Sequence, residues 1–491
     1  MIKNYKKLLV FLLLLCLLFT TGCDKNNKND NKLPDKLIIY TINDFHGALE
    51  EVDGKYGAAR ISGYIKENKI TNSDAATLVV SSGDMFQGSA ISNHTRGEIV
   101  VDIMNEVGFN AMTIGNHEFD WDLSTVLKYR DGDLSNGEAN FPFLGCNIIE
   151  KETSSIPEYV DPYNIVEVKG LKIGIIGYMG FGLEDSIATS MIEDYYFSEP
   201  VEAISLYAEK LRTEENCDIV IASGHDGDTL TNKQISKLNG DSRVDAIING
   251  HTHATYAEIY KRDDGVVIPC IQTGTAGENV GVITLNINEN KEVSDGSSFN
   301  MQMGKRVTPD SIVKKMVDDI VLETAPVFKR VLCTAGAEIN QIKGAKWAAN
   351  ALSKGIDCEV AFINSGGIRN SAFPISNGEE VTVSKVFEIM PFDNTIKTVY
   401  LKGKYIKSLI NSSGIVTSDN ITGSTATGYY INNEPLDDEK LYKVAAVDYI
   451  FDQSSYPFGL GENSVATGIL FRDILIKTLE DINNEGQKWL G

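Results

Sequence analysis

Five of the six histidines in this chain of 491 residues lie in short polar turns, each directly after a run of aliphatic or β-branched residues. No histidine follows residue 253. Imidazole is the commonest side-chain ligand for zinc-like metal ions, and histidines placed only for core packing would not gather in this way. The pattern therefore predicts a metal site, with the sixth histidine, His94, as a solvated loop residue. The five candidates are His46, His117, His225, His251 and His253.

Aspartate and asparagine share these turns. Each motif alone is weak, because Asp and Asn are ordinary turn formers and a buried histidine is often satisfied by other partners. Their order after five separate hydrophobic runs is much stronger. Oxygen and imidazole ligands without thiolate are typical of zinc, manganese, cobalt or iron. In chain order the motifs are Asp44-Phe45-His46, Gly83-Asp84, Gly115-Asn116-His117-Glu118, Gly224-His225 and Gly250-His251-Thr252-His253.

The hydrophobic runs before the turns predict buried strands, and the amphipathic stretches between them predict helices. This alternation is typical of a layered α/β domain, in which ligands gather at the carboxyl ends of the strands. We expect strands at residues 37–42, 77–80, 111–114, 219–222 and 244–248, and a helix at residues 98–107.

A second α/β domain is expected after a connecting helix. Apolar residues at helical spacing follow Thr308-Pro309, a pair typical of a helix start. Beyond them, helical stretches alternate again with short β-branched runs. We therefore expect a first domain over residues 37–305, a linker helix over residues 306–330 and a second domain over residues 331–491.

The ordered set of turns resembles the calcineurin-like metallophosphoesterase superfamily over roughly residues 37–288. The resemblance implies a β-sheet sandwich flanked by helices and two divalent metal ions. Two ions about 3.5–4 Å apart need a shared anionic ligand, which is the role implied for Asp84. His253 stands where relatives often carry Gln or Asn. One ion is implied to bind Asp44, His46, Asp84 and His253, and the other Asp84, Asn116, His225 and His251.

The same resemblance implies the catalytic groups. His117 would face the substrate, Asp120 would orient its ring, and Glu118 would support the ligands from behind. Two divalent ions offset the charge of a phosphate ester and lower the pKa of a bound water toward about 7, so hydroxide can attack at neutral pH. A protonated imidazole would stabilise the transition state or protonate the leaving oxygen.

Two signatures in the second region resemble the C-terminal domain of bacterial 5'-nucleotidases. With the run 444–449, the match spans most of residues 331–475. It implies that Arg369 holds the phosphate, that Asn364 contacts the nucleoside, and that Phe392 and Tyr449 sandwich the base. Substrate contacts are also implied for Gly366, Gly367 and Asn394. The signatures are Asn364-Ser365-Gly366-Gly367-Ile368-Arg369 and Pro391-Phe392-Asp393-Asn394.

The second region also departs from that family pattern. Relatives carry arginines upstream of the Gly-Gly-Ile-Arg turn, whereas residues 338–346 contain lysines and no arginine. After Tyr449 the sequence lacks the Gly-Gly-Asp-Gly-Tyr of relatives, so it predicts no ribose contact by an aspartate. From the residues alone, a tight turn at Gly366-Gly367 and core packing of Phe392 and Tyr449 remain alternatives.

These implications favour a metal-dependent phosphohydrolase, foremost a 5'-nucleotidase that removes phosphate from nucleotides. A 2',3'-cyclic-nucleotide phosphodiesterase or a nucleotide-sugar hydrolase would use the same site, and a more distant relative acts on sulfur-linked groups. Outside the enzyme class, the alternative is a surface nucleotide-binding lipoprotein with a vestigial site. The complete set of seven ligands argues against this alternative, because a decayed site would lose some of them.

The first 36 residues are expected to export and tether the protein. Basic residues precede an apolar run at 8–19, which is too short for a membrane span of about 20 residues and is typical of a signal peptide over residues 1–23. The residues Thr20-Thr21-Gly22-Cys23 resemble a lipoprotein cleavage site, which implies lipidation of Cys23. Simple cleavage and secretion is the alternative. Residues 24–36 form a polar tether. We expect the domains outside the cytoplasm, held at the membrane only through the lipid.

The overall charge excludes one class of partner. Lys and Arg total 45 against 68 Asp and Glu, a net charge of −23 without a basic cluster, so we expect no binding to nucleic acid. Apart from Cys16 and Cys23, the spacing of the five cysteines matches no zinc or disulfide framework, so at least one is unpaired. The oligomeric state does not follow from the sequence.

Overall fold

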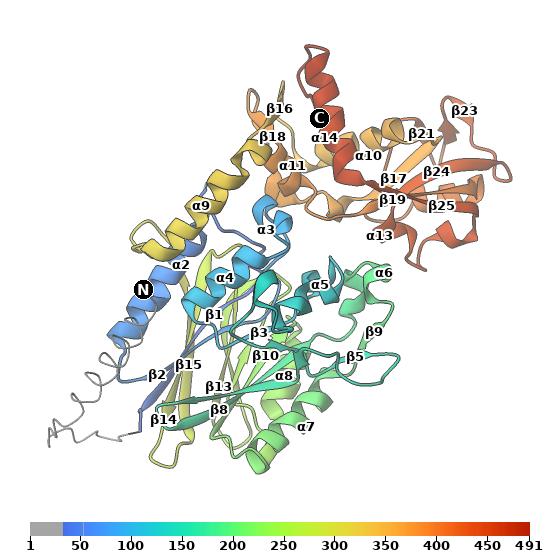
Figure 1. The fold of residues 1–491 in the computed structure, drawn as a ribbon. Helices are drawn as coiled ribbons and strands as arrows, with labels where there is room; N and C mark the ends of the chain where they lie inside the picture. Colours follow the sequence, from blue (N-terminus) through green and yellow to red (C-terminus); the bar gives the residue numbers. More distant parts are fainter. Residues whose placement is uncertain (1–32, 53) are drawn as a thin grey trace, which may run out of the picture. The chain divides into compact units, whose positions relative to one another are not determined.

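Two mixed β-sheets form the layered domain that carries the predicted turns (Figure 1). The computed structural model describes residues 33–52 and 54–491, and Pro34–Gly491 belong to one compact unit. In the first sheet five neighbouring strands run parallel, and two antiparallel strands complete one edge. The strand order is β15 (Val293–Gln302), β14 (Asn279–Ile287), β1 (Lys36–Ile42), β2 (Ala76–Ser81), β3 (Ala111–Thr113), β4 (Phe143–Leu144) and β6 (Val160–Asp161).

The second sheet has parallel strands at its centre and an antiparallel strand at each edge. The strand order is β12 (Thr255–Lys261), β13 (Val267–Thr273), β11 (Ala246–Ile248), β10 (Ile219–His225), β8 (Leu171–Met179) and β7 (Tyr163–Val168). β10 and β11 at the centre of the sheet are buried along their whole length, and β8 at all but one residue, as expected for parallel strands covered on both faces. A short pair, β5 (Ile148–Glu150) and β9 (Tyr195–Phe197), lies outside both sheets.

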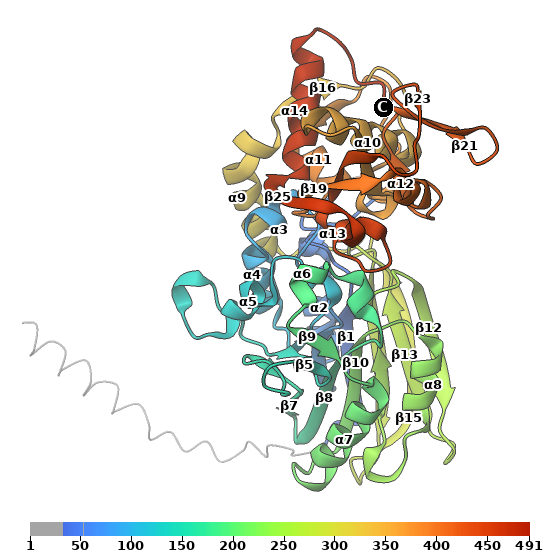
Figure 2. The ribbon, with the colours of Figure 1, turned by 90° about the vertical axis from the view of Figure 1, so that its right-hand side faces the viewer.

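The two sheets pack face to face, and helices cover their outer faces. Between them, Thr113 Oγ1 on β3 donates a hydrogen bond to Ser223 Oγ on β10 at 2.8 Å. Figure 2 shows α7 beside β8 and α8 beside β12, on the second sheet. Apolar residues of α2 and α4 pack in one core cluster with Tyr40 of β1. These helices are α2 (Gly57–Thr71), α4 (Glu98–Val107), α7 (Pro200–Thr213) and α8 (Thr229–Lys237).

The predicted elements of the first domain are present, and α4 has its predicted bounds. β10 extends three residues beyond its predicted end, because its pairing with β8 continues to His225. The prediction for His94 was half wrong. Its side chain is exposed, but the residue ends a short helix, α3 (Ala90–His94), because the Ser89 hydroxyl caps that helix.

The linker helix lies within its predicted range as α9 (Ser311–Phe328). It begins after Thr308-Pro309, because the Asp310 carboxylate accepts a hydrogen bond from Ile312 N and so caps the first turn. The helix packs against α2 of the first domain and against α11 (Val383–Ile389) of the second, where Phe328 contacts Phe387 edge to face at 5.4 Å. The linker is therefore held on both sides.

A five-stranded mixed sheet forms the centre of the second domain. Only the pair β17 and β24 is parallel, and the other neighbours are antiparallel. Helices α10 (Gln341–Gly355) and α14 (Phe471–Asn484) pack against each other beside this sheet. The strand order is β20 (Ile415–Thr417), β17 (Val360–Asn364), β24 (Leu441–Val447), β19 (Thr395–Lys402) and β25 (Glu462–Leu470).

The remaining short elements complete the chain. Two small sheets lie in the second domain, β16 (Val331–Thr334) with β18 (Glu380–Thr382), and β21 (Ile421–Ser424) with β22 (Gly428–Ile431) and β23 (Glu434–Pro435). The short helices are α5 (Leu123–Leu127), α6 (Thr189–Ile192), α12 (Gly403–Ile410) and α13 (Asp448–Phe451).

Cys146, Cys217, Cys270, Cys333 and Cys358 are free, so the expectation of unpaired cysteines holds for the described residues. Within residues 33–52 and 54–491, every helix is too short or too polar to cross a membrane. The predicted signal peptide, Cys23 and residues 24–32 of the predicted tether lie outside the described residues.

Candidate metal centre and substrate pocket

The strands of both sheets end at a single site. Parallel neighbours end at the same edge of a sheet, and the two sheets pack face to face, so residues far apart in sequence meet there. The structure brings all seven predicted ligands to this site. The first sheet supplies Asp44, His46, Asp84 and Asn116, and the second sheet supplies His225, His251 and His253.

One group of ligand atoms is formed by Asp44, His46 and His253. His46 Nε2 lies 3.1 Å from His253 Nε2, which lies 3.4 Å from Asp44 Oδ1. The candidate ligand atoms of this group all lie within 4.8 Å of one another. Two imidazole nitrogens and a carboxylate oxygen at this separation match the ligand set of a divalent cation.

A second group is formed by Asn116, His225 and His251. Asn116 Oδ1 lies 3.0 Å from both His225 Nε2 and His251 Nδ1. Asp84 connects the two groups, because one of its oxygens lies 3.2 Å from His225 Nε2 and it also clusters with His46. The position of Asp84 between the groups is the one expected of a bridging ligand.

Main-chain carbonyls orient two of the imidazole rings. His46 Nδ1 lies 2.8 Å from the carbonyl oxygen of Gln87, and His225 Nδ1 lies 2.8 Å from that of Ser82. Such a bond fixes the tautomer, so that Nε2 of each ring is directed into the ligand group.

The backbone at the site is strained. Five of the seven predicted ligands have positive φ angles between 48° and 75°, a region that costs a non-glycine residue free energy. The sharp turns need glycine as well. Gly83 has φ of 94°, and a Cβ on Gly115 would lie 2.3 Å from Asp84 Oδ1. The five ligands are Asp44, His46, Asp84, His251 and His253.

The electrostatics of the site favour a bound cation. Burial lowers the pKa of His46 to about 3 and that of His251 to about 4, so both rings are neutral and have a free lone pair at pH 7. Burial opposes charge on His225, but the Asp84 carboxylate outweighs it and raises the pKa of His225 to about 10. The buried carboxylates therefore attract positive charge, and the donor set fits divalent metal ions.

Glu118 holds the ligand turns together from behind. Its carboxylate is fully buried and accepts hydrogen bonds from the main-chain N–H groups of Gly115, Asp84 and Met85 at 2.7, 2.9 and 3.0 Å. Burial raises the pKa of Glu118 to about 7. These contacts match the supporting role expected for Glu118, because they join the turn after β2 to the turn after β3.

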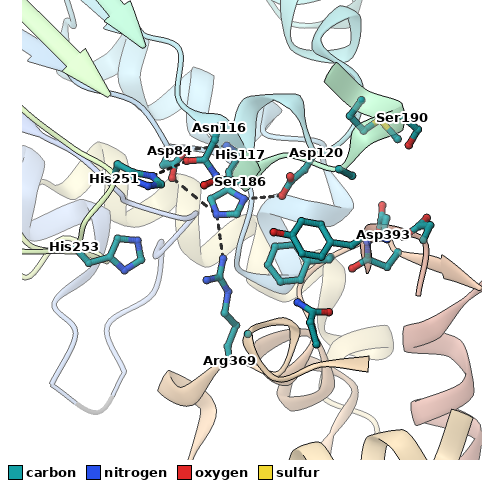
Figure 3. Close-up of a pocket in the computed structure, with 18 residues that line it drawn as sticks. Asp84, Asn116, His117, Asp120, Ser186, Ser190, His251, His253, Arg369 and Asp393 are labelled. Carbon is teal, nitrogen blue, oxygen red and sulfur yellow. Dashed lines mark hydrogen bonds and ion pairs between the residues drawn. The ribbon is translucent and has the colours of Figure 1, made fainter. Parts of the chain in front are cut away.

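His117 lies between the metal ligands and the second domain: its Nε2 lies 4.0 Å from Asp84 Oδ2, and it clusters with His46 and Asp84. Its Nδ1 donates a hydrogen bond to Asp120 Oδ2 at 2.7 Å, and its Nε2 lies 3.1 Å from Arg369 Nη2 (Figure 3). Burial opposes protonation of the ring, but the Asp120 and Asp84 carboxylates outweigh it and raise the pKa of His117. The structure thus pairs His117 with Asp120, as expected.

The second domain completes a pocket of about 300 Å³ beside the ligand groups. Arg369 follows the turn after β17, and its guanidinium lies 4.7 Å from the centre of the Phe392 ring. The same ring stacks on His117 with a centroid distance of 5.8 Å. The predicted substrate residues that line the pocket are Asn364, Gly366, Arg369, Phe392, Asn394 and Tyr449. Gly367 is buried within the turn and does not line the pocket.

Asp448 was not predicted from the sequence, and it positions two of these residues. One of its carboxylate oxygens accepts hydrogen bonds from Asn394 Nδ2 and Tyr449 N, at 2.7 and 2.8 Å. The other accepts from the main-chain N–H and the hydroxyl of Thr395. An aspartate next to an expected base-stacking residue was a signal that could have been noticed.

A segment of the first domain also lines the pocket without any sequence signal. Ser186, Ala188, Ser190 and Met191 lie opposite the second domain, and the carbonyl of Asp185 accepts a hydrogen bond from Tyr449 Oη at 3.3 Å. Residues of these types occur on most surfaces, so the sequence could not have singled them out.

In residues 338–346, where relatives carry arginines, the structure shows what one side chain does instead. Gln341 lies behind the Gly366-Gly367 turn, and its side-chain amide donates to the carbonyls of Ser365 and Ile368 at 3.0 and 3.1 Å. This residue supports the turn from outside. Arg369 is the arginine that lines the pocket.

Two family models match the chain. The model for calcineurin-like phosphoesterases matches residues 37–255, and that for the 5'-nucleotidase C-terminal domain matches residues 331–457. The first covers the sheets and turns with the predicted metal ligands. The second covers the strands and turns that contribute Arg369, Phe392 and Tyr449.

Curated relatives resemble the chain over most of its length. A snake venom 5'-nucleotidase from Gloydius brevicauda is 24% identical, over 92% of this chain and 79% of the relative. Protein UshA from Yersinia enterocolitica is 25% identical, over 92% of each chain. The crystal structure of a 5'-nucleotidase precursor from Thermus thermophilus superimposes with a TM-score of 0.73 at 21% identity, over 91% of this chain and 96% of that one.

Proposed function

Because this chain belongs to the family in which a calcineurin-like phosphoesterase domain precedes a 5'-nucleotidase C-terminal domain, we propose that it releases phosphate from nucleoside 5'-monophosphates. The observation that carries this proposal is the shared pocket in which the metal ligand groups meet Arg369, Phe392 and Tyr449. Neither half of the pocket would suffice alone, because one supplies the chemistry and the other supplies contacts for a nucleoside.

Two divalent ions are proposed at the site. One would be held by Asp44, His46 and His253, the other by Asn116, His225 and His251, and Asp84 would bridge them. Bound ions would offset the negative charge of the phosphate and lower the pKa of a water molecule toward neutrality.

His117 is proposed as the general acid. Asp120 holds its Nδ1, so its Nε2 faces the position where Arg369 also points. A phosphate placed there would pair with the guanidinium fork, and the imidazole would stabilise the charge of the transition state or protonate the leaving oxygen.

The nucleoside is proposed to bind between Phe392 and Tyr449. Flat bases stack on aromatic rings, and both rings line the pocket. Asn394 donates its amide N–H to Asp448, so its carbonyl oxygen is available to accept a hydrogen bond from the base. Asn364 is proposed to contact the nucleoside from the turn after β17.

The proposed location is outside the cytoplasm, at the membrane through a lipid on Cys23. The signal-like segment supports export, and one relative is a venom protein. A Cys23→Ala variant should lose incorporation of labelled lipid in cells. Equal labelling of the variant and the wild-type protein would contradict lipidation at Cys23.

Analysis of the products made by the purified protein tests the proposed activity, because a nucleoside 5'-monophosphate yields phosphate and a nucleoside, whereas the cyclic nucleotide and the nucleotide-sugar yield a nucleoside monophosphate. The protein would be chelated, reconstituted with Mn²⁺ or Zn²⁺, and offered a nucleoside 5'-monophosphate, a 2',3'-cyclic nucleotide and a nucleotide-sugar. The proposal requires metal-dependent release, fastest from the monophosphate. Faster turnover of either other substrate would reassign the substrate class, and no turnover with metals bound would favour a binding protein.

A further inference from the structure

Asp393 lies between two arginines that come from different domains. Its Oδ1 pairs with Arg472 of α14, and its Oδ2 pairs with Arg96, which follows α3 in the first domain. The Asp393 side chain is 18% exposed, and those of Arg472 and Arg96 are 6% and 44% exposed. Asp393 therefore connects a buried cation of its own domain to an accessible cation of the other.

Arg472 fixes the loop on which Asp393 lies. One nitrogen of its guanidinium donates to the carbonyls of Met390, Pro391 and Phe392 at 3.2, 3.1 and 3.1 Å. From the first domain, Asn93 Nδ2 donates to the Pro391 carbonyl at 2.7 Å. The loop 390–394 is thus bound from both domains.

Arg96 is itself held in place. It has φ of 54°, and its main-chain carbonyl accepts a hydrogen bond from Tyr129 Oη at 2.8 Å. Its guanidinium lies 5.3 Å from the centre of the Trp121 ring, and Trp121 directly follows Asp120. Arg96 therefore links the segment that carries the His117–Asp120 pair to Asp393.

The contacts form a closed series that includes His117. Asp393 adjoins Phe392, whose ring stacks on His117. His117 in turn bonds to Asp120 (Figure 3). The ion pair of Arg96 with Asp393 and the contact of Arg96 with Trp121 complete this series. Displacement of the pair would move Phe392 relative to His117.

We propose that the Arg96–Asp393 ion pair is a positioning contact that sets Phe392, and hence a stacked base, in register with His117. The inference rests on the proposed function, since it assumes that Phe392 stacks on a base. Arg96 and Asp393 act through Phe392 and are not catalytic residues. The pair should therefore affect nucleotides more than a phosphate ester that has no base.

The test compares a nucleoside 5'-monophosphate with ribose 5-phosphate, the same ester without a base. An exposed ion pair is worth little, so Arg96→Ala should lower kcat/KM for the nucleotide by about threefold to fivefold. Arg96→Glu would place two carboxylates together and should lower it by about tenfold or more. Arg96→Lys retains the charge and should restore most of the lost activity.

A matched control distinguishes the effect of the Arg96 position from the effect of a change in net charge. Lys237 forms an exposed ion pair with Asp263 in the same domain, so Lys237→Glu changes the net charge equally away from the pocket. This control should leave both substrates unaffected, and melting temperatures should show that every variant is folded. Kinetics of Arg96→Ala, Asp393→Asn and the double variant should be non-additive, because the two side chains contact each other.

The outcomes distinguish the inference from the proposed function. A selective loss for the nucleotide with rescue by Arg96→Lys supports the positioning role. Equal losses on both substrates, or additive effects of the two substitutions, overturn it while the nucleotidase activity stands. No phosphate release by the wild-type protein from either substrate would refute the proposed function itself.

Discussion

The two ends of the pocket are built in different ways. At the metal end, the side chains project from strand ends, most of them from strained backbone, and Glu118 joins two of their turns; Asp44, Asp84, Asn116 and His225 are buried. At the substrate end, Arg369, Phe392 and Tyr449 are only partly buried, and side-chain contacts from two domains hold their loops. The difference indicates that the fold fixes the metal ligands at one end, whereas the contacts that select the substrate at the other end depend on loops. Substitutions at the metal end should therefore change metal binding and turnover, and those at the substrate end should change substrate recognition.

The largest effect is expected at the bridging carboxylate. Asp84→Ala removes the ligand that both groups share, so metal should be lost and turnover should fall by more than the 10–100-fold typical of changes behind a ligand. Elemental analysis of the purified variant, beside the wild-type protein, measures the metal directly. Retention of both ions would contradict the bridging role.

His117→Ala should separate metal binding from catalysis. We expect both ions to remain, because the substitution leaves all seven predicted ligands in place, and kcat to fall by about 10²–10⁴-fold. Asp120→Asn is the companion variant, since it keeps the shape but weakens the hydrogen bond to Nδ1. If His117→Ala lost metal together with activity, His117 would belong to the metal end.

Glu118→Gln tests the support behind the metal end. The amide would direct a donor toward main-chain N–H groups, so metal affinity should drop by about 10–100-fold. The affinity is measured by competition with a chelator. An unchanged affinity would mean that the strained turns hold their shape without this carboxylate.

At the substrate end, Phe392→Ala should change recognition and leave the chemistry intact. Loss of one stacking face should raise KM for a nucleotide by about tenfold, with kcat and metal content nearly constant. Ribose 5-phosphate serves as the control substrate, since it has no base to stack. A similar rise in KM for both substrates would remove the stacking role.

A metal site at the strand ends could be predicted from local sequence, because the polar turns directly follow hydrophobic runs that form buried strands, whereas the individual ligands came from the family resemblance. Asp44, Asp84 and His225 come together as soon as the strands align. Glu118 was expected in a supporting role, and the structure adds the main-chain N–H groups that it binds.

The substrate end could not be predicted from local sequence in this way. Arg369 and Phe392 were recognised through family signatures, not through periodicity. The pairing of Asp393 with Arg96 joins residues 297 positions apart, and no local pattern encodes it. Ser186 and Ser190 reach the pocket only because their segment packs against the second domain.

The central claim is that the metal end carries out the chemistry and the substrate end recognises the nucleoside. Steady-state kinetics test it most directly, with a nucleoside 5'-monophosphate and ribose 5-phosphate as substrates before and after chelation. Chelation should abolish release from both substrates, and readdition of Mn²⁺ should restore both with a higher kcat/KM for the nucleotide. Metal-independent release, or equal kcat/KM for the two substrates, would contradict the account.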